Sequence, residues 1–371
     1  MYTHRSIDIV IPSFRLDENI LANIINLEKP AGYDVHIYIV ADNPNATIPQ
    51  KITDLSKQGK AHLIKNDVNL GFSATRNKGI LVGKSRWILL LDDDIIPADR
   101  LLLAYARAIE SYPHAIGFMG VTNFPEPFNN ITKALKINGS IGHFESAKYH
   151  NKLLWAPTAN IVLNRERLTM PLFNEELKKG GEDIEFLLRN ALKNKETYVA
   201  CPEALVTHPW WNEGNIQTKR MFRYGIGASE ISTLPVIKKY TYYDFTNTSE
   251  TLLLLILALP FAAIAKTADI IFLLILITLL SEFITNLIKV AKTTGKNSFS
   301  ITWHLFWVKN MYELGYLVSN LMRGNIRGFA KRIDMSFRKE NPSWFRLNRW
   351  KIIKSLLLIL FTLLAISLVK G

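Results

Sequence analysis

The sequence predicts an α/β protein with a mostly parallel sheet flanked by helices, followed by C-terminal transmembrane and interfacial helices. Two observations predict it. Short apolar segments alternate with helical stretches through the first 240 residues, and long apolar runs follow. Alternating strands and helices are typical of a parallel sheet covered on both faces. We therefore expect a cytoplasmic domain at residues 1–240 and a membrane region at residues 241–371.

The composition narrows the range of partners. The chain has 371 residues and a net charge of +13, a length that fits two units of about 100–200 residues each. Residues 241–371 hold 16 Lys/Arg against 7 Asp/Glu, among apolar runs. This placing of the charge favours anionic lipid as a partner over nucleic acid, which we do not expect. The single cysteine, Cys201, excludes a disulfide scaffold and a multi-cysteine metal site.

The elements of the first domain follow from local pattern. Residues 7–11, 35–40 and 87–91 have the apolar character of strands, and residues 17–28 and 73–83 have helical spacing. The run at 87–91 shows no polar alternation, as expected of a buried central strand. Because ligands bind at the carboxyl ends of such strands, the polar residues that follow them predict a site at one edge.

Three apolar runs predict the membrane helices, at residues 252–265, 270–288 and 352–369. A bilayer core needs about 17–25 apolar helical residues, so the second and third runs are long enough. The first, if extended back to residue 245, forms a helical hairpin 245–288 with the second. The alternative is that these runs are buried helices of a soluble domain.

Charged residues predict the orientation. Lys238 and Lys239 precede the hairpin and three lysines at 289–296 follow it, so both ends are expected to face the cytoplasm. The predicted location is therefore the inner (plasma) membrane, multi-pass. The basic segment 323–354, with ten Lys/Arg, is expected on the cytoplasmic leaflet. Residues 301–321 mix aromatic and charged side chains, which predicts an interfacial helix, with a spanning helix as the alternative.

The strongest chemical signal is the acidic triplet Asp92-Asp93-Asp94 at the end of a buried strand. Neighbouring carboxylates repel one another and lose solvation there, so a cation is needed to compensate. Strand alternation puts Asp92 and Asp94 on one face. Mg²⁺ or Mn²⁺ is the natural partner of such oxygens. A solvated acidic turn, or a helix cap before Pro97, is the alternative.

A second signal is the segment 69–77, in which Gly71 permits a tight bend. Ser73 is expected to cap a helix whose N-terminal amides attract phosphate, and Arg76, one turn in, could pair with an anion. A plain junction between a loop and a helix is the alternative.

A third and a fourth signal lie further along. Glu182 and Asp183 begin a helix after two glycines, and one of them could accept a proton from a hydroxyl. Acids that complement the helix dipole are the alternative.

His208 ends a strand and could complete a carboxylate metal site, or be structural. Trp210 and Trp211 could stack on a sugar or lie at the membrane surface.

In their order, these segments resemble a family 2 inverting glycosyltransferase of the GT-A fold over about residues 5–230. The resemblance is carried by the strand 10–14, the strand ending at 41–43, the segment 69–77, the triplet 92–94, the pair 182–183 and His208. The carboxylate triplet and the Glu–Asp pair at this spacing are its specific parts. The segment Gln217-x-x-Arg220-Met221 resembles a degenerate Gln–Arg–Trp motif of processive members, with Met221 in place of the tryptophan.

The resemblance implies roles for individual residues. Asp42 would contact the nucleotide base, Asp92 the ribose, and Asp94 and His208 the metal. Asp183 would be the general base, with Glu182 near the acceptor. Donor binding is expected from the following residues: Pro12, Ser13, Asp42, Asn69, Gly71, Arg76, Asp92, Asp93, Asn160 and Arg220.

These roles describe a membrane-bound enzyme that moves a sugar from a nucleoside-diphosphate sugar to a hydroxyl of a polyprenyl-linked or other membrane glycan, with Mg²⁺ or Mn²⁺. Three alternatives remain open. The acceptor could be polyprenyl phosphate itself, which needs no general base. The chain could be a polysaccharide synthase, or a membrane scaffold without catalysis.

Overall fold

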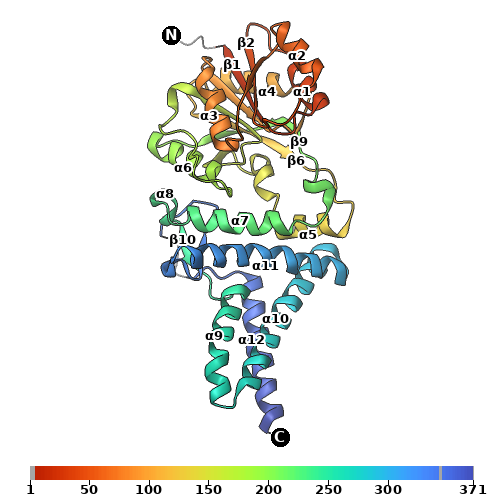
Figure 1. Cartoon of the computed structure of the whole chain (residues 1–371), viewed down its shortest axis with the longest axis vertical. Coiled ribbons are helices and arrows are strands. Elements are labelled where there is room, and N and C mark those ends of the chain that lie inside the picture. The colour runs from red at the N-terminus through yellow and green to blue at the C-terminus, as the bar shows by residue number, and fades with distance from the viewer. Residues whose placement is uncertain (1–4, 342–344, 371) are drawn as a thin grey trace. The chain divides into compact units, whose positions relative to one another are not determined.

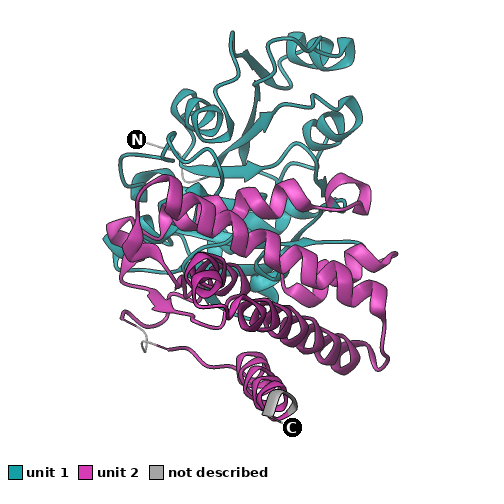
Figure 2. Cartoon of the chain, turned by 60° about the horizontal axis from the view of Figure 1, so that its bottom comes forward, with its two compact units in different colours: residues 1–126, 141–210 teal, residues 127–140, 211–371 magenta. Residues whose placement is uncertain are grey.

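The computed structural model describes residues 5–341 and 345–370, without the side chains of 368–370. Parts of the predicted basic segment and of the last apolar run therefore lie outside the described residues. The chain forms two compact units (Figure 2): unit 1 comprises residues 1–126 and 141–210, and unit 2 comprises residues 127–140 and 211–371. The division differs from the predicted boundary at residue 240, because a stretch near residue 130 and the segment 211–240 pack with the C-terminal helices.

Unit 1 is built on a nine-stranded mixed sheet (Figure 1) in the order β3-β2-β1-β4-β8-β6-β9-β5, with β7 beside β9. The strands β3, β2, β1 and β4 are parallel neighbours, β8 runs antiparallel between β4 and β6, and β6 is parallel to β9. All long strands except β8 therefore point the same way, which confirms the predicted α/β class. The strands are β1 Ser6–Ser13, β2 Asp34–Ala41, β3 His62–Lys65, β4 Trp87–Leu91, β5 Ile96–Pro97, β6 Gly117–Asn123, β7 Lys152–Leu153, β8 Asn160–Asn164 and β9 Tyr198–Thr207.

Helices cover both faces of this sheet. The helices of unit 1 are α1 Glu18–Ile25, α2 Gln50–Lys57, α3 Phe72–Val82, α4 Leu101–Ser111 and α6 Glu182–Asn194, with short 3₁₀ helices η1 Gly142–Lys148 and η2 Arg165–Arg167. Odd-numbered residues of β1, such as Ile7 and Ile9, join α1, α2 and α4 in one buried core. On the other face α3 approaches so closely that a Cβ on Gly79 would lie 2.4 Å from Val10 Cγ1. Alternation of side chains along each strand produces these two faces.

Unit 2 is mainly helical. Its elements are α5 Asn130–Asn138, η3 Trp211–Gly214, α7 Thr218–Ile231, α8 Pro235–Lys238, β10 Thr241–Tyr243, α9 Thr248–Ile264, α10 Ala268–Thr294, α11 Phe299–Met322, η4 Ile326–Gly328, β11 Lys331–Ile333 and α12 Arg349–Lys370. A small core of Ala134, Val290, Ile301 and Leu305 joins α5 to α10 and α11, which explains why α5 belongs to this unit.

Two glycines allow α7 and α11 to cross closely. A Cβ on Gly225 of α7 would lie 2.0 Å from the carbonyl oxygen of Tyr312, and a Cβ on Gly315 of α11 would lie 2.0 Å from that of Phe222. Small residues at a helix crossing let the two backbones approach each other.

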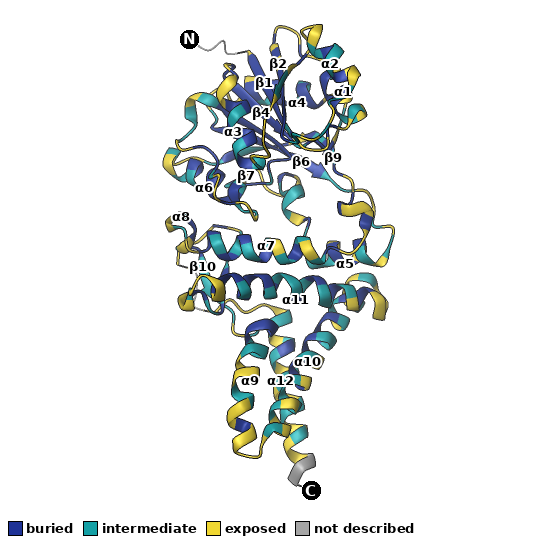
Figure 3. Ribbon diagram, in the orientation of Figure 1, coloured by how far each residue is buried: buried dark blue, intermediate teal, exposed yellow. Residues whose placement is uncertain are grey.

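Within the part of the chain that the structure describes, two helices are long and apolar enough to cross a membrane: α10 and residues 349–367 of α12. The helix α9 is apolar but shorter. Their outward faces are exposed (Figure 3), including large side chains such as Leu257, Phe272 and Leu360. Length and composition thus indicate membrane association for this unit.

The basic segment behaves differently from the prediction. Four of its cations are engaged within unit 2: Arg332 pairs with Glu250, Arg346 with Asp334, Lys351 with Asp244 and Lys354 with Glu282. These side chains are therefore committed to intramolecular ion pairs, and fewer cations of the segment are left for a lipid surface than the sequence predicted.

Candidate active site

Polar side chains from the ends of β4 and β9 meet at one edge of the sheet in unit 1. Asp92 and Asp94 follow β4, and His208 follows β9. One ligand atom from each of these three residues lies within 4.8 Å of the other two. The parallel direction of the long strands brings these residues together although more than 110 positions separate them in the sequence.

The tautomer of His208 suits a metal ligand. Its Nδ1 lies 2.6 Å from the carbonyl oxygen of Pro209, and because a carbonyl only accepts, Nδ1 carries the hydrogen. Nε2 then presents a lone pair toward Asp94 Oδ1, 3.3 Å away. Two acceptors at this distance repel each other unless a proton or a metal ion lies between them, and a donor set of two carboxylates and one imidazole fits a divalent ion. Phe124 stacks on the imidazole at 5.0 Å and holds its orientation.

Electrostatics at Asp94 point the same way. Burial raises the pKa of this carboxyl, the neighbouring His208 lowers it and the charge of Asp92 raises it, with a net upward shift. A carboxylate whose ionisation is resisted by its surroundings gains stability when a cation approaches.

Asp93 points away from this pair and organises the loop after β1. Its Oδ2 accepts hydrogen bonds from Ser13 Oγ at 3.0 Å and from the backbone N–H groups of Phe14 and Arg15 at 2.9 Å each. The guanidinium of Arg15 contacts Asp93 Oδ1 at 2.5 Å and Asp94 Oδ2 at 3.0 Å. In the structure Asp93 and Ser13 therefore hold a loop, and Pro12 lies within β1 just before it. Arg15 is a site residue that the sequence interpretation missed.

Asp42 holds a second loop. Its carboxylate accepts hydrogen bonds from Asn66 Nδ2 at 2.8 Å and from the N–H groups of Leu70 at 2.8 Å and Gly71 at 2.9 Å. Asn69 adds a bond to its Oδ1 from the N–H of Gly71. Gly71, at φ 83°, is the N-cap of α3. The prediction that Ser73 caps this helix is wrong, because α3 already begins at Phe72, which puts Ser73 inside the first turn.

Arg76 joins the two acidic segments. It is 6% exposed, and its guanidinium donates to Asp92 Oδ1 at 3.1 Å and to Glu182 Oε1 at 3.0 Å. The sequence predicted an anionic partner for Arg76, and the structure provides two carboxylates. Since both acids contact one guanidinium, the N-terminus of α6 lies directly beside the Asp92–Asp94–His208 cluster.

Glu182 and Asp183 form the first turn of α6, after Gly180 and Gly181 at φ 115° and 93°. Glu182 pairs with Arg76, whereas Asp183 has no ion pair among the described residues and accepts only the N–H of Ile184, at 2.8 Å. Burial, and next the charge of Glu182, raise the pKa of Asp183 to about 8. Burial raises the pKa of Glu182 as well, against the lowering effect of Arg76. Two neighbouring acids whose pKa values are raised by their surroundings are typical of acid–base sites.

The structure gives Asn160 a different role from the predicted one. It is 1% exposed, and its Nδ2 donates to the carbonyl oxygens of Val121 and Ala204 while Tyr105 donates to its Oδ1. Both of its polar groups are thus used inside the sheet, which leaves no free group for a donor sugar in this state.

The tryptophans are also placed differently. Trp210 and Trp211 are each 4% exposed, so neither offers a free face to a sugar or a lipid. The Arg220 guanidinium lies 4.9 Å from the Trp211 ring and donates to Tyr224 within unit 2. Gln217 donates to the carbonyl oxygen of Trp211, so this motif forms its own contacts in α7. The donor role of Arg220 stays a prediction.

Comparisons with known proteins identify similar glycosyltransferases. Residues 8–168 match the family model "Glycosyl transferase family 2". An uncharacterized glycosyltransferase of Methanocaldococcus jannaschii, MJ1057, is 24% identical over 225 residues, which is 59% of this chain and 77% of the relative.

Similar solved structures were also found. S. aureus TarS 1-349 is 14% identical with a TM-score of 0.42, over 62% of this chain and 66% of that one. GalNAc-T7 with UDP, GalNAc and Mn²⁺ is 15% identical with a TM-score of 0.47, over 63% of this chain and 49% of that one. This chain therefore spans less than two thirds of either structure.

The carboxylates and the imidazole gathered at one edge of the sheet are typical of the active site of an α/β enzyme. Residues 8–168 match the family 2 glycosyltransferase domain, and the chain is a glycosyltransferase.

Proposed function

We propose that the protein is a membrane-bound inverting glycosyltransferase. It transfers a sugar from a nucleoside-diphosphate sugar to a hydroxyl group of a lipid-linked glycan, with Asp183 as the general base. The observation that carries the proposal is Arg76, which ties Asp92 of the acidic cluster to Glu182 at 3.1 and 3.0 Å. This contact puts a prospective base next to a prospective metal site, where acceptor and donor must meet.

Asp183 has the properties that a base needs. An acceptor hydroxyl is a poor nucleophile, and a base works best when its pKa lies near the working pH. A pKa of about 8 makes Asp183 a far stronger base than an ordinary carboxylate. Arg76 pairs with Glu182 and favours its charged form, so that Asp183 is the member of the pair that exchanges a proton. Glu182 then remains to accept a hydrogen bond from the acceptor glycan.

The rest of the site deals with the leaving group. A divalent ion at Asp92, Asp94 and His208, when bound, supplies positive charge for the departing diphosphate. Arg15 lies beside Asp94 with a 54% exposed side chain and can contact a diphosphate oxygen from the loop after β1. Asp42 fixes the 66–71 loop near the expected base of the nucleotide. A single displacement with these groups inverts the anomeric carbon.

The apolar helices support a membrane acceptor. We propose that α9 and α10 form a hairpin and that α12 spans the inner membrane, with unit 1 on the cytoplasmic side and α11 at the interface. The exposed apolar faces of these helices support this placement, because water would contact them otherwise. A glycan attached to a polyprenyl lipid is then the acceptor class that stays within reach.

The test is transfer by the full-length protein in vesicles. A panel of radiolabelled nucleoside-diphosphate sugars, with Mn²⁺ or Mg²⁺, is offered with three acceptors: lipid-linked glycans, the same glycans free in solution, and polyprenyl phosphate. We expect transfer to the lipid-linked acceptor, at least about 10²-fold slower in Asp183→Asn, the lower limit for loss of a general base. Asp94→Ala should lose the response to metal.

Three outcomes would reject parts of the proposal. Unchanged transfer by Asp183→Asn to a polyprenyl phosphate would assign an acceptor that is already ionised. Equal transfer to soluble and lipid-linked glycans would remove the membrane acceptor from the proposal. Transfer of many sugars to one primer would instead indicate a polysaccharide synthase.

A further inference from the structure

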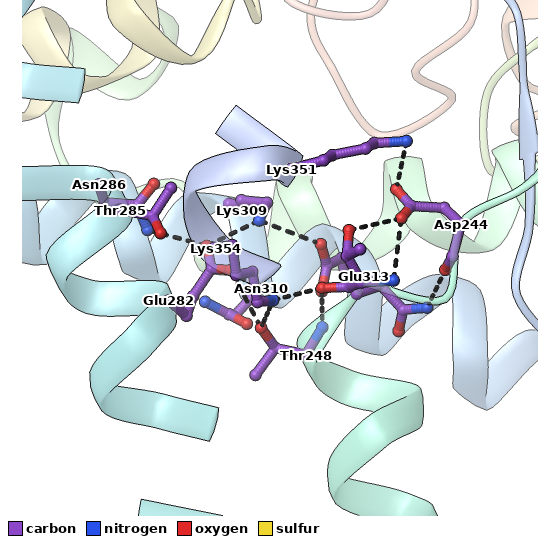
Figure 4. Close-up of polar contacts among 12 residues, drawn as sticks. Asp244, Thr248, Glu282, Thr285, Asn286, Lys309, Asn310, Glu313, Lys351 and Lys354 are labelled. Carbon is purple, nitrogen blue, oxygen red and sulfur yellow. Dashed lines mark hydrogen bonds and ion pairs between the residues drawn. The ribbon is translucent and has the colours of Figure 1, made fainter. Parts of the chain in front are cut away.

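Unit 2 contains a buried ionic cluster where α9, α10, α11 and α12 meet (Figure 4). At its centre is Glu282 of α10, which is fully buried. Glu282 Oε1 contacts Lys309 Nζ of α11 at 2.7 Å, and Oε2 contacts Lys354 Nζ of α12 at 2.7 Å. Thr248, the first residue of α9, donates to Oε2 at 3.2 Å. Both oxygens of this carboxylate are therefore occupied.

The charges within this cluster balance. Glu313 of α11 lies 3.6 Å from Lys309 and accepts the N–H of Thr248 at 2.8 Å. Glu282 and Glu313 thus offset Lys309 and Lys354. A second pair, Asp244 with Lys351, is balanced by itself at 2.9 Å. Buried charges persist when they are paired and hydrogen-bonded in this way, and no external ion is needed here.

Two cations beside the cluster are not balanced. In the described part of the chain, neither Lys289 of α10 nor Arg349 of α12 has a carboxylate partner. Lys289 is partly buried, and it is repelled by Lys309 and Arg349 and attracted only by Glu282. Since Glu282 is already saturated by two lysines, the region around Lys289 and Arg349 carries uncompensated positive charge.

Helix geometry puts these two residues at a similar height in unit 2, and the charge of Arg349 acts on Lys289. Lys289 lies seven residues after Glu282, on the same face of α10 and about 10 Å further along its axis. Arg349 lies five residues before Lys354, about 7 Å along α12. The helices α10 and α12 run in opposite directions (Figure 1) and are joined by the Glu282–Lys354 pair. The step from Glu282 to Lys289 and the step from Lys354 to Arg349 therefore lead toward the same end of the helix bundle. The two cations therefore lie at a similar height.

That height corresponds to the end of two apolar runs. Lys289 directly follows the apolar residues 270–288, and Arg349 precedes the run that starts at residue 352. In a bilayer, positions at this depth lie among the lipid headgroups, where basic residues meet phosphate. The N-terminal end of α12 adds positive potential at Arg349.

We infer that Lys289 and Arg349 form a binding site for the phosphate headgroup of a membrane lipid, with Lys309 at its inner side. The inference rests on the membrane placement proposed above. The phosphate supplies the negative charge that the protein lacks at this point. It links α10, α11 and α12 through one headgroup, and the acyl chains lie along the exposed apolar faces of the two spanning helices.

The experiment is a thermal-stability titration of the full-length protein in a neutral detergent. Three probes are added separately: phosphatidic acid, diacylglycerol with the same tails, and inorganic phosphate. We expect phosphatidic acid to raise the melting temperature by mass action, and the other two to leave it unchanged at equal concentration. The double variant K289Q/R349Q should bind phosphatidic acid about 30-fold more weakly, because each basic residue near such a headgroup contributes about fivefold.

The matched control is K292Q/K296Q, which removes the same charge from exposed positions just beyond Lys289. It should bind phosphatidic acid like the wild type. Without lipid, K289Q/R349Q should melt no lower than the wild type, because it removes two cations that repel each other. Equal losses in both double variants, or a lower melting temperature of K289Q/R349Q without lipid, would overturn the site.

Three further results separate this inference from the proposed function. Stabilisation by inorganic phosphate as strong as that by phosphatidic acid would overturn the lipid assignment and leave the membrane placement standing. A wild-type protein that fails to float with phosphatidylcholine vesicles would instead refute the membrane placement. Flotation without any effect of phosphatidic acid would refute the lipid site alone.

Discussion

Replacing Asp183 by asparagine should make the protein more stable, by an amount that grows with pH. Burial and the neighbouring Glu182 raise the pKa of Asp183 from 3.8 to about 8. Between about pH 4 and pH 8 the folded protein therefore holds a proton that the unfolded chain has released. The free energy of unfolding falls with rising pH across this range, because the unfolded state binds fewer protons. An asparagine side chain at this position does not titrate, and its oxygen can still accept the hydrogen bond from the N–H of Ile184.

The size of the effect follows from the shift. One pKa unit corresponds to about 1.4 kcal/mol, and pH 7 lies about three units above the ordinary pKa that the carboxyl has in the unfolded chain. The destabilisation of the wild type at pH 7 is then at most on the order of 4 kcal/mol, and it is nearly absent at pH 4. For a unit of about 200 residues, 1 kcal/mol shifts the melting temperature by about 2–4 °C. Asp183→Asn should therefore melt up to about 16 °C higher than the wild type at pH 7.

The assay is a melting curve of the two proteins in detergent at pH 5, 6, 7 and 8, with a chelator and without added metal. The difference in melting temperature should increase at each step. Asp67→Asn, at an exposed position, is the control and should show no trend. A difference that stays constant with pH, or a variant less stable than the wild type at pH 8, would refute the account of Asp183 as a destabilised acid.

Two other substitutions test the loop after β1 and the helix crossing in unit 2. Arg15→Gln removes a cation 3.0 Å from Asp94, so the variant should bind Mn²⁺ alone up to about fivefold more tightly. It should bind a nucleoside diphosphate together with Mn²⁺ more weakly, and calorimetry measures both affinities. Changes of both affinities in the same direction would exclude a contact between Arg15 and the diphosphate. Gly225→Ala places a methyl group 2.0 Å from the carbonyl oxygen of Tyr312, so α7 or α11 must shift and the free energy of unfolding should fall by about 1–3 kcal/mol in a denaturant titration. Gly142→Ala, with open space around its Cβ, should change it little, and equal effects would argue against a tight crossing.

The sheet could be predicted because its signals are local. The strand at 7–11 and the strand at 87–91 are short apolar runs, and the observed strands Ser6–Ser13 and Trp87–Leu91 contain them. The rule that ligands gather at the carboxyl ends then placed the acidic triplet at the correct edge. The allocation of α5 to unit 2 could not be predicted in this way. It depends on contacts of Ala134 with residues more than 150 positions away, and no local pattern encodes them.

In the site, residue types were easier to predict than partners. The acids and His208 were found because few other residue types do their chemistry. The roles of Asp93 and Asn160 depend on backbone groups at 14–15, 121 and 204, which only the folded chain brings near. Likewise, an arginine such as Arg15, next to a strand end, becomes informative only when the acid opposite it is known. The basic segment was misread for the same reason, because its acidic partners are distant in sequence.

Charge balance connects the stability and the chemistry of the site. Five carboxylates gather there: Asp92, Asp93, Asp94, Glu182 and Asp183. Only two arginines, Arg15 and Arg76, pair with them among the described residues. The excess of negative charge favours a divalent cation at Asp94 and His208, and burial together with this charge raises the pKa of Asp183 to about 8. A third buried arginine would stabilise the fold, but it would also compete with the cation and weaken the base. The site therefore contains more carboxylates than arginines. This imbalance lowers the stability of the fold, and it provides the cation site and the strong base that the proposed reaction uses.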